Sequence, residues 1–210
     1  MVKLSCRLQA AADLVRDGAR LADVGCDHGY VPVSLVLSGK IPAAVASDIN
    51  EGPLQSCANL VREYALEDNI RCVLSDGLQE VNSEDVDDIL IAGMGGEMIA
   101  KILSACPWAK EKHLVLNAMT HTELAREWLF ENGFAIQNDI IVKEGRHYYS
   151  VLDAVYTGEN TAYAAADCYL GNINDFTHKE YFVHLLNYLR NKQKSGEDLS
   201  GIITAIEEKL

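Results

Sequence analysis

The 210-residue sequence has no long hydrophobic run, no closely paired cysteines and no excess of positive charge. A membrane-spanning helix needs about 18 or more mostly apolar residues, and no such stretch occurs. The first ten residues also lack the apolar core of a signal peptide, so we expect a cytoplasmic protein. Apolar residues make up 49% and charged residues 23% of the chain. This composition is typical of a globular domain that can bury its own core.

The scattered cysteines and the acidic charge limit the possible partners. The six cysteines include no C-x-x-C pair and suit buried free thiols, so we expect no metal site. The formal net charge is -13, so a nucleic acid would have to be held by local basic patches against an unfavourable overall field. Residues 1–20 form the candidate patch, with Lys3, Arg7, Arg16 and Arg20.

Strand-like apolar runs alternate with helical stretches through most of the chain. Apolar residues at helical spacing predict an opening helix that ends at Gly18. Strands are predicted at 20–24, 43–48, 70–74, 88–92 and 113–117, with helices at 31–38, 53–65, 97–104 and 122–132. This alternation predicts a parallel sheet covered by helices on both faces.

The pattern changes after residue 133. Two strand runs, 134–142 and 147–156, flank a glycine-containing turn and predict an antiparallel hairpin. Apolar stripes around 182–189 and 199–206 then predict a helical hairpin. We expect one domain over residues 1–157 and a small helical appendage over 158–210. The appendage would either only pack on itself and the domain, or form an arm that touches a large substrate.

The strongest chemical signal lies between Leu21 and Tyr30, where a strand runs into a glycine-containing turn and then a helix. Gly25 and Gly29 allow a sharp turn whose N–H groups can approach a ligand. Dinucleotide-binding loops have G-x-G-x-x-G, but here Asp27 takes the place of the middle glycine. A carboxylate there would repel a pyrophosphate and tolerate a sulfonium and an ammonium. This favours S-adenosylmethionine over NAD, although Asp27 could instead cap the helix.

Acidic residues accompany three successive predicted strands. Asp23 lies in the first, Asp48 ends the second, and Asp76-Gly77 follows the third. Each alone would suit a turn, but together they should meet at the carboxyl edge of the sheet, where such folds bind ligands. There Asp48, with Ile49 beside it, would receive the ribose hydroxyls of a nucleoside, and Asp76 the adenine amino group.

The fourth predicted strand ends in Ala92-Gly93-Met94-Gly95-Gly96. These glycines leave open backbone against which the methyl donor or a flat base could lie. We assign Ala92 and Gly93 to the donor, and Met94 and Gly95 to the base. A tight strand-to-helix turn would have the same composition.

Taken together, these segments resemble the bacterial tRNA (adenine-22, N1)-methyltransferase family. The shared segments are Leu4-Ser5-x-Arg7-Leu8-Gln9, Asp23-x-Gly25-x-Asp27-His28-x-Tyr30, Asp76-Gly77-Leu78, Ala92-Gly93-Met94-Gly95-Gly96, Arg126-x-Trp128-Leu129 and Tyr149-x-Val151-Leu152. After the fifth strand this chain has Asn117-Ala118-Met119, where many members have Gln-Pro-Asn or Gln-Pro-Met.

The resemblance implies an α/β fold, with a Rossmann-like class I methyltransferase sheet that ends in an antiparallel hairpin and carries a small helical tail. It also implies S-adenosylmethionine as the cofactor and tRNA as the substrate, methylated at N1 of an adenine. We expect a monomer that needs neither a metal nor a membrane.

The chemistry of adenine N1 suggests roles for individual residues. N1 has a lone pair and can attack without first losing a proton, so in-line positioning matters more than a strong base. A carboxylate would stabilise the charge that the base gains, and Asp27 is the candidate, with His28 orienting the reactants. Arg7 is a candidate for the cofactor carboxylate, and Arg126 and Arg146 for RNA phosphates. Each arginine could equally be an ion-pair partner.

Asn117 and Tyr149 complete the candidates on the substrate side. Asn117 ends the fifth predicted strand, and either Tyr149 or its neighbour Tyr148 could stack on a base while the other faces the core. Two other functions remain open. The protein could methylate another RNA, a small molecule or a protein, or it could be a non-catalytic module that binds S-adenosylmethionine.

Overall fold

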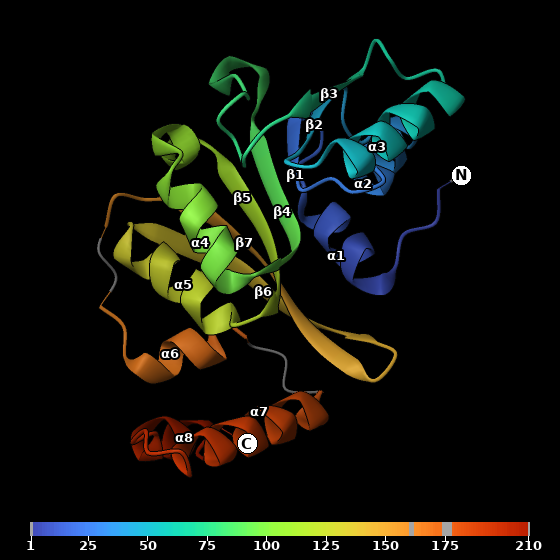
Figure 1. Ribbon diagram of the computed structural model, residues 1–210. Helices are drawn as coiled ribbons and strands as arrows, with labels where there is room; N and C mark the ends of the chain where they lie inside the picture. Colours follow the sequence, from blue (N-terminus) through green and yellow to red (C-terminus); the bar gives the residue numbers. More distant parts are fainter. Residues whose placement is uncertain (1, 160–161, 174–177, 210) are drawn as a thin grey trace.

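The computed structural model describes residues 2–159, 162–173 and 178–209 of the chain. Its centre is a seven-stranded sheet with the order β3-β2-β1-β4-β5-β7-β6 (Figure 1). The strands are β1 (Leu21–Val24), β2 (Ala44–Asp48), β3 (Ile70–Leu74), β4 (Asp88–Gly95), β5 (His113–Thr120), β6 (Phe134–Glu144) and β7 (His147–Tyr156). The first five are parallel, and β7 runs antiparallel to both β5 and β6. The predicted parallel sheet with a closing antiparallel hairpin is confirmed.

Helices cover both faces of the sheet (Figure 1). One face carries α1 (Cys6–Leu14), α2 (Tyr30–Leu37) and α3 (Glu51–Glu63), and the other carries α4 (Gly96–Ser104) and α5 (Thr122–Glu131). Short 3₁₀ turns lie at Ser83–Asp85 and Pro107–Glu111. Side chains of β4 alternate between the two cores: Ile89 and Ile91 face α4 and α5, whereas Leu90 faces α1 to α3. Every residue of β1 and β2 is therefore buried.

Three helices follow the hairpin: α6 (Ala165–Leu170), α7 (Lys179–Gln193) and α8 (Ser200–Glu207). The last two match the predicted helical hairpin, whereas α6 was not predicted. Buried Phe182, Leu189 and Ile206 join Ile141 of β6 in one apolar cluster, so the tail packs on the sheet as well as on itself. No helix of the described residues is long and apolar enough to cross a membrane. The division at residue 157 stays a prediction, and part of the irregular stretch after it (160–161 and 174) lies outside the described residues.

The order of the strands reverses at β1. The chain builds β2 and β3 on one side of β1 and then places β4 on its other side. Connections therefore leave the carboxyl ends of β1 and β4 in opposite directions, which opens a crevice between them. The register pairs Val24 with Ile91, so the turn after Val24 and the glycine-rich end of β4 face each other across that crevice.

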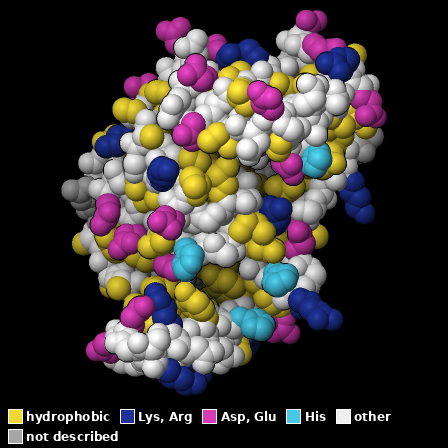
Figure 2. Space-filling view, viewed as in Figure 1, with side chains coloured by type: hydrophobic (Ala, Val, Ile, Leu, Met, Phe, Trp, Pro, Cys, Tyr) yellow, Lys and Arg dark blue, Asp and Glu magenta, His cyan; other side chains and the backbone are white. Residues whose placement is uncertain are grey.

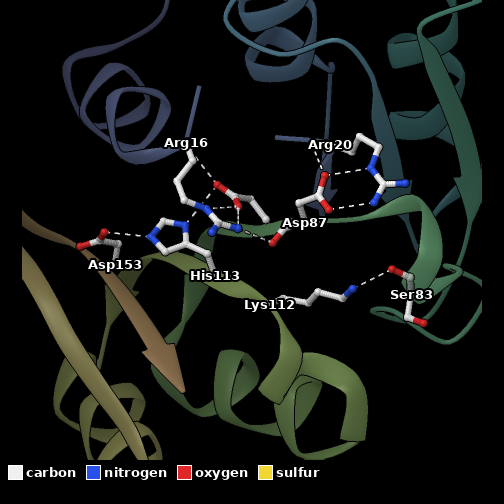
Figure 3. Close-up of polar contacts among 8 residues, drawn as sticks. Arg16, Arg20, Ser83, Asp87, Lys112, His113 and Asp153 are labelled. Atoms are coloured by element: carbon white, nitrogen blue, oxygen red, sulfur yellow. Dashed lines mark hydrogen bonds and ion pairs between the residues drawn. The ribbon is translucent and has the colours of Figure 1, made fainter. Parts of the chain in front are cut away.

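The opposite, amino edge of the sheet carries ion pairs (Figure 3). Arg16 donates to the buried carboxylate of Asp88 through its Nε at 2.8 Å, and Arg20 donates to Asp87 at 2.8 Å in the same way. The Arg20 hydrogen bonds hold the pKa of Asp87 well below its usual range. The prediction of a basic patch over residues 1–20 is therefore corrected: Arg16 and Arg20 neutralise carboxylates at the edge away from the crevice.

His113 lies between two buried carboxylates at the same edge. Its Nδ1 is 3.1 Å from Asp88 and its Nε2 is 2.9 Å from Asp153 (Figure 3). Burial alone would lower the pKa of His113, but its hydrogen bonds with Asp153 and Asp88 outweigh burial and raise the pKa to about 9. His113 is thus a cation at neutral pH and joins β4, β5 and β7.

Replacing His113 with Gln should lower the free energy of unfolding by about 3–5 kcal/mol at pH 7, because two buried carboxylates lose their shared cation. Since the folded pKa lies above the ordinary value of 6.5, the stabilisation is complete below pH 6.5 and is lost as the pH rises through about 9. Chemical denaturation at pH 6.5, 8 and 10 would measure it. A difference between variant and wild type that does not shrink at pH 10 would contradict the assignment.

Candidate active site

Carboxylates gather at the carboxyl edge of β1, β2 and β3, as the sequence predicted. Asp23 is the third residue of β1, Asp48 ends β2, and the Ser75 amide after β3 donates to the Asp48 carbonyl at 2.9 Å. The Ser47 hydroxyl donates to the Gly77 carbonyl at 3.3 Å. The segment that carries Asp76 is therefore fixed beside the end of β2, on the same edge as the other two carboxylates.

The turn after β1 is held against β2 by its own backbone. The amides of Gly25 and Cys26 both donate to the Ser47 carbonyl, at 2.8 and 2.9 Å. Gly25 has φ +71°, and a Cβ there would lie 2.2 Å from the terminal methyl of Met94. The positive φ favours glycine here, and a larger residue would also have to displace the flexible end of the Met94 side chain.

Asp27 adopts a strained backbone conformation in the same turn, with φ 49°. The N-cap residue of α2 is Gly29, and no side chain caps this helix. The alternative reading of Asp27 as a helix cap is therefore wrong. The Asp27 side chain is 70% exposed, and its Oδ1 lies 3.6 Å from Nε2 of His28. The His28 ring in turn stacks on Tyr30, with ring centres 5.3 Å apart.

A cavity of about 330 Å³ opens at this crevice. It is lined by Arg7, Leu8, Asp23, Gly25, Cys26, Asp27, His28, Tyr30, Val31, Asp48, Asn50, Pro53, Ala92 and Gly93. Both predicted catalytic residues and six of the nine predicted cofactor residues are in this set. Sequence reasoning did not assign Leu8, Cys26, Tyr30, Val31, Asn50 and Pro53 to the site. All but Pro53 lie within three positions of a predicted site residue, and that proximity was the available signal.

The remaining predicted cofactor residues, with Met94 and Gly95, lie outside this cavity. Asp76 lines a neighbouring hollow of about 320 Å³. Ile49 is 60% exposed at the rim. Met94 covers Gly25, and Gly95 approaches the Thr120 side chain.

The cavity contains a buried carboxyl group with an unusual charge state. Burial, together with the nearby Asp48 carboxylate, raises the pKa of Asp23 to about 7. In contrast, the Asp48 Oδ1 accepts a hydrogen bond from the Asn50 amide at 2.9 Å. No hydrogen bond to the Asp23 carboxyl occurs within the described residues. An ammonium group of a ligand would supply both the missing donor and the missing charge.

Arg7 brings the positive charge to the cavity. Its backbone N–H donates to Glu144 at 3.1 Å, and its Nε lies 3.5 Å from the same carboxylate. Its Nη1 donates to the side-chain oxygen of Asn117 at 3.2 Å, and its guanidinium lies 5.8 Å from the centre of the Tyr149 ring. The helix α1, the middle of β5 and the β6–β7 hairpin therefore orient this arginine together.

Two predicted substrate residues are corrected by their burial. Asn117 is fully buried, and its amide nitrogen donates to the Ser150 carbonyl at 3.0 Å, so it supports Arg7 and does not face a substrate. Arg126 is also buried and forms a two-point ion pair with Asp139 at 2.9 and 3.1 Å. Although it borders the hollow beside α7, its five N–H donors all bond to acceptors within the protein, which leaves none for a phosphate. Tyr149 is half-buried beside Arg7, whereas Arg146 is exposed at the hairpin turn.

This fold and this site define a class of protein: residues 4–152 match the family model of the methyltransferase domain. The tRNA (adenine(22)-N(1))-methyltransferase of Bacillus subtilis is 37% identical over 167 residues, covering 77% of this chain and 69% of the relative. The chain therefore belongs to the tRNA (adenine-22, N1)-methyltransferase family of class I S-adenosylmethionine-dependent methyltransferases.

Solved structures support this assignment. The crystal structure of the B. subtilis m1A22 tRNA methyltransferase TrmK superposes with a TM-score of 0.83 at 28% identity, over 99% of this chain and 94% of that chain. A Streptococcus pneumoniae relative in complex with S-adenosyl-L-methionine superposes with a TM-score of 0.87 at 31% identity, over 98% and 99% of the two chains.

Replacing Asp23 with Asn should stabilise the ligand-free protein and abolish tight cofactor binding. Because the folded pKa is raised from 3.8 to about 7, the ionised carboxylate costs stability, and that cost is complete above pH 7. We expect a gain of roughly 2 kcal/mol at pH 8 that shrinks towards pH 5. Denaturation at both pH values and calorimetry with S-adenosylhomocysteine would measure the two effects, with Asp68→Asn as an exposed control. A destabilised variant that still binds tightly would contradict the prediction.

Replacing Arg126 with Met should lower the free energy of unfolding by about 3–5 kcal/mol, because Asp139 would be left buried and unpaired. The same change at exposed Arg146 should leave stability unchanged. Urea denaturation of both variants is the measurement. If Arg126→Met were as stable as the wild-type protein and bound tRNA more weakly, the original assignment of Arg126 to an RNA phosphate would be supported.

Proposed function

We propose that this protein transfers the methyl group of S-adenosylmethionine to N1 of adenine 22 in tRNA. The observation that carries the proposal is the single cavity in which Asp23, Asp27, Asp48 and Arg7 converge on a glycine turn. Membership of the family indicates tRNA as the substrate, and the arrangement of charges in the cavity supports S-adenosylmethionine as the methyl donor.

The residues of the cavity fit S-adenosylmethionine. Asp48 lies at the end of β2, where a carboxylate receives ribose hydroxyls. Asp23 offers a buried carboxyl group to an ammonium, and Arg7 offers a guanidinium to a carboxylate. The neighbouring hollow beside Asp76 is suited to the adenine end. The bound donor supplies an electrophilic methyl group on a sulfonium.

Asp27 and His28 are placed to act on the acceptor base. Both are exposed at the mouth of the cavity, on a turn that hydrogen bonds hold against β2. N1 gains positive charge as the new bond forms, and a carboxylate close to the amino edge of the base stabilises that charge. His28 stacks on Tyr30 and thereby keeps its ring beside Asp27. Since N1 lies on the pairing edge, the target adenine must first be unpaired.

Contacts with the RNA must be few and local. Lysine and arginine side chains are interspersed with acidic ones on the face shown in Figure 2, without a continuous basic area. With Arg16 and Arg20 paired at the amino edge, Lys3 and Arg146 are the exposed cations that remain from the predicted patches. We propose that the domain of residues 1–157 holds the chemistry and that residues 158–210 shape the substrate side.

Incubation of unmodified tRNA with the protein and labelled S-adenosylmethionine should produce 1-methyladenosine at position 22. Mass spectrometry of digested nucleosides identifies the base, and a transcript with guanine at position 22 is the control. Bound cofactor without any methylated nucleoside would disprove the RNA substrate and favour a small-molecule or protein acceptor.

Replacing Asp27 with Ala should reduce the rate of methyl transfer about 100-fold, because the carboxylate that stabilises the developing charge is lost. The affinity for S-adenosylhomocysteine should change little, since the Asp27 side chain is exposed and Asp23 and Asp48 remain. Single-turnover kinetics and calorimetry measure the two quantities, with exposed Asp68→Ala as the control. An unchanged rate would remove Asp27 from the mechanism.

A further inference from the structure

A second hollow, of about 280 Å³, lies between the start of α5 and the first long tail helix, α7. Figure 2 shows it above the α7–α8 pair, with hydrophobic side chains at its floor and histidine side chains at its edges. Three tyrosines line it: Tyr169 of α6, and Tyr181 and Tyr188 of α7. We call this hollow the tyrosine groove.

The tyrosines are held by the fold. Tyr181, Leu185 and Tyr188 follow one another at helical spacing, so they form one flank of α7, beside the flank that packs into the tail core. Tyr169 is fixed by buried Arg126, which donates to its carbonyl at 2.8 Å. Tyr188 is 43% exposed. The groove therefore presents aromatic surface on a rigid frame.

The groove adjoins the reaction edge of the sheet. Thr120 and His121 form one wall of it, and both lie against the glycine-rich end of β4 and the start of α4. A Cβ on Gly95 would lie 3.2 Å from the Thr120 hydroxyl, and one on Gly96 would lie 1.9 Å from the His121 carbonyl. Gly93, two residues before Gly95, lines the cavity between β1 and β4, so one glycine-rich segment runs from that cavity to the wall of the groove.

His121 has a strained backbone at this wall. Its φ is 53°, a left-handed conformation that a non-glycine residue rarely adopts. His121 is also the N-cap residue of α5, so this turn fixes the start of that helix at the wall of the groove.

We propose that the tyrosine groove binds an unstacked nucleotide of the substrate RNA next to the methylated adenine. Exposing N1 disrupts the stack around the target, and its neighbour then needs a new aromatic surface. Tyrosines suit any base because every base has a π-face, and the hydroxyl of exposed Tyr188 can bond to a base edge. This inference rests on the proposed function and adds the place where the flanking RNA is held.

The test compares two faces of the same helix. Tyr188→Ala should raise the KM for tRNA roughly five- to hundredfold, the range for loss of one base–aromatic stack. The KM for S-adenosylmethionine and the thermal stability should not change. Tyr188→Phe keeps the ring and should behave as wild type. Val183→Ala, on an exposed part of α7 outside the groove, is the matched control.

Abasic tRNA identifies the nucleotide. One set of transcripts lacks the base on the 5′ side of the target adenine, and another lacks the base on its 3′ side. At one of these two positions, loss of the base should weaken tRNA binding by the wild-type protein but not by Tyr188→Ala. The groove assignment would be wrong if Tyr188→Ala and each missing base weakened tRNA binding additively, or if Tyr188→Ala had the same KM for tRNA as Val183→Ala. Methylation of tRNA by the wild-type protein would still support the proposed function in either case. Absence of methyl transfer by wild type would overturn both.

Discussion

The site depends on two hydrogen bonds, from the Gly25 and Cys26 amides to the Ser47 carbonyl. They hold the turn after β1 against the end of β2 at the point where the order of the strands reverses. Asp23 then lies under the turn without a hydrogen-bond donor among the described residues, and Asp27 lies at the mouth of the cavity. The turn favours glycine at position 25 because its φ is +71°, and the Met94 side chain at the end of β4 packs on it. A ligand therefore binds where the backbone leaves charge unmatched.

The two edges of the sheet treat buried charge in opposite ways. At the amino edge, Asp88 and Asp153 share a charged His113, so these buried groups stabilise the fold. At the carboxyl edge, the Asp23 carboxyl group is buried with a raised pKa and no cation within hydrogen-bond distance in the described residues. This unmatched charge costs stability in the free protein and is compensated when a ligand brings an ammonium. The same contrast separates residues kept for stability from residues kept for binding.

Local patterns predicted most of the fold, and most of the predicted cofactor residues meet in one cavity. Buried strands and rim carboxylates are visible in the sequence because each depends on neighbours within a few residues. Arg126 and Asn117 were misassigned because their partners, Asp139 and Ser150, lie in the β6–β7 hairpin. The sequence predicts that hairpin but not which of its residues contact other parts of the chain. The helix α6 was missed because six residues carry little helical periodicity, and it is held by hydrogen bonds from Arg126 to its carbonyls.

The acidic net charge of -13 constrains how this protein can recognise RNA. Six arginines are already ion-paired with carboxylates: Arg7, Arg16, Arg20, Arg71, Arg126 and Arg190. These ion pairs lower the positive charge that is available to release counterions from the phosphate backbone, which reduces both nonspecific affinity and its dependence on salt. Part of the affinity must then come from contacts that are not electrostatic, such as stacking on aromatic side chains and fit to an unpaired nucleotide. A protein with only a weak general attraction for nucleic acid would bind a tRNA whose shape exposes the target adenine more tightly than it binds other RNA.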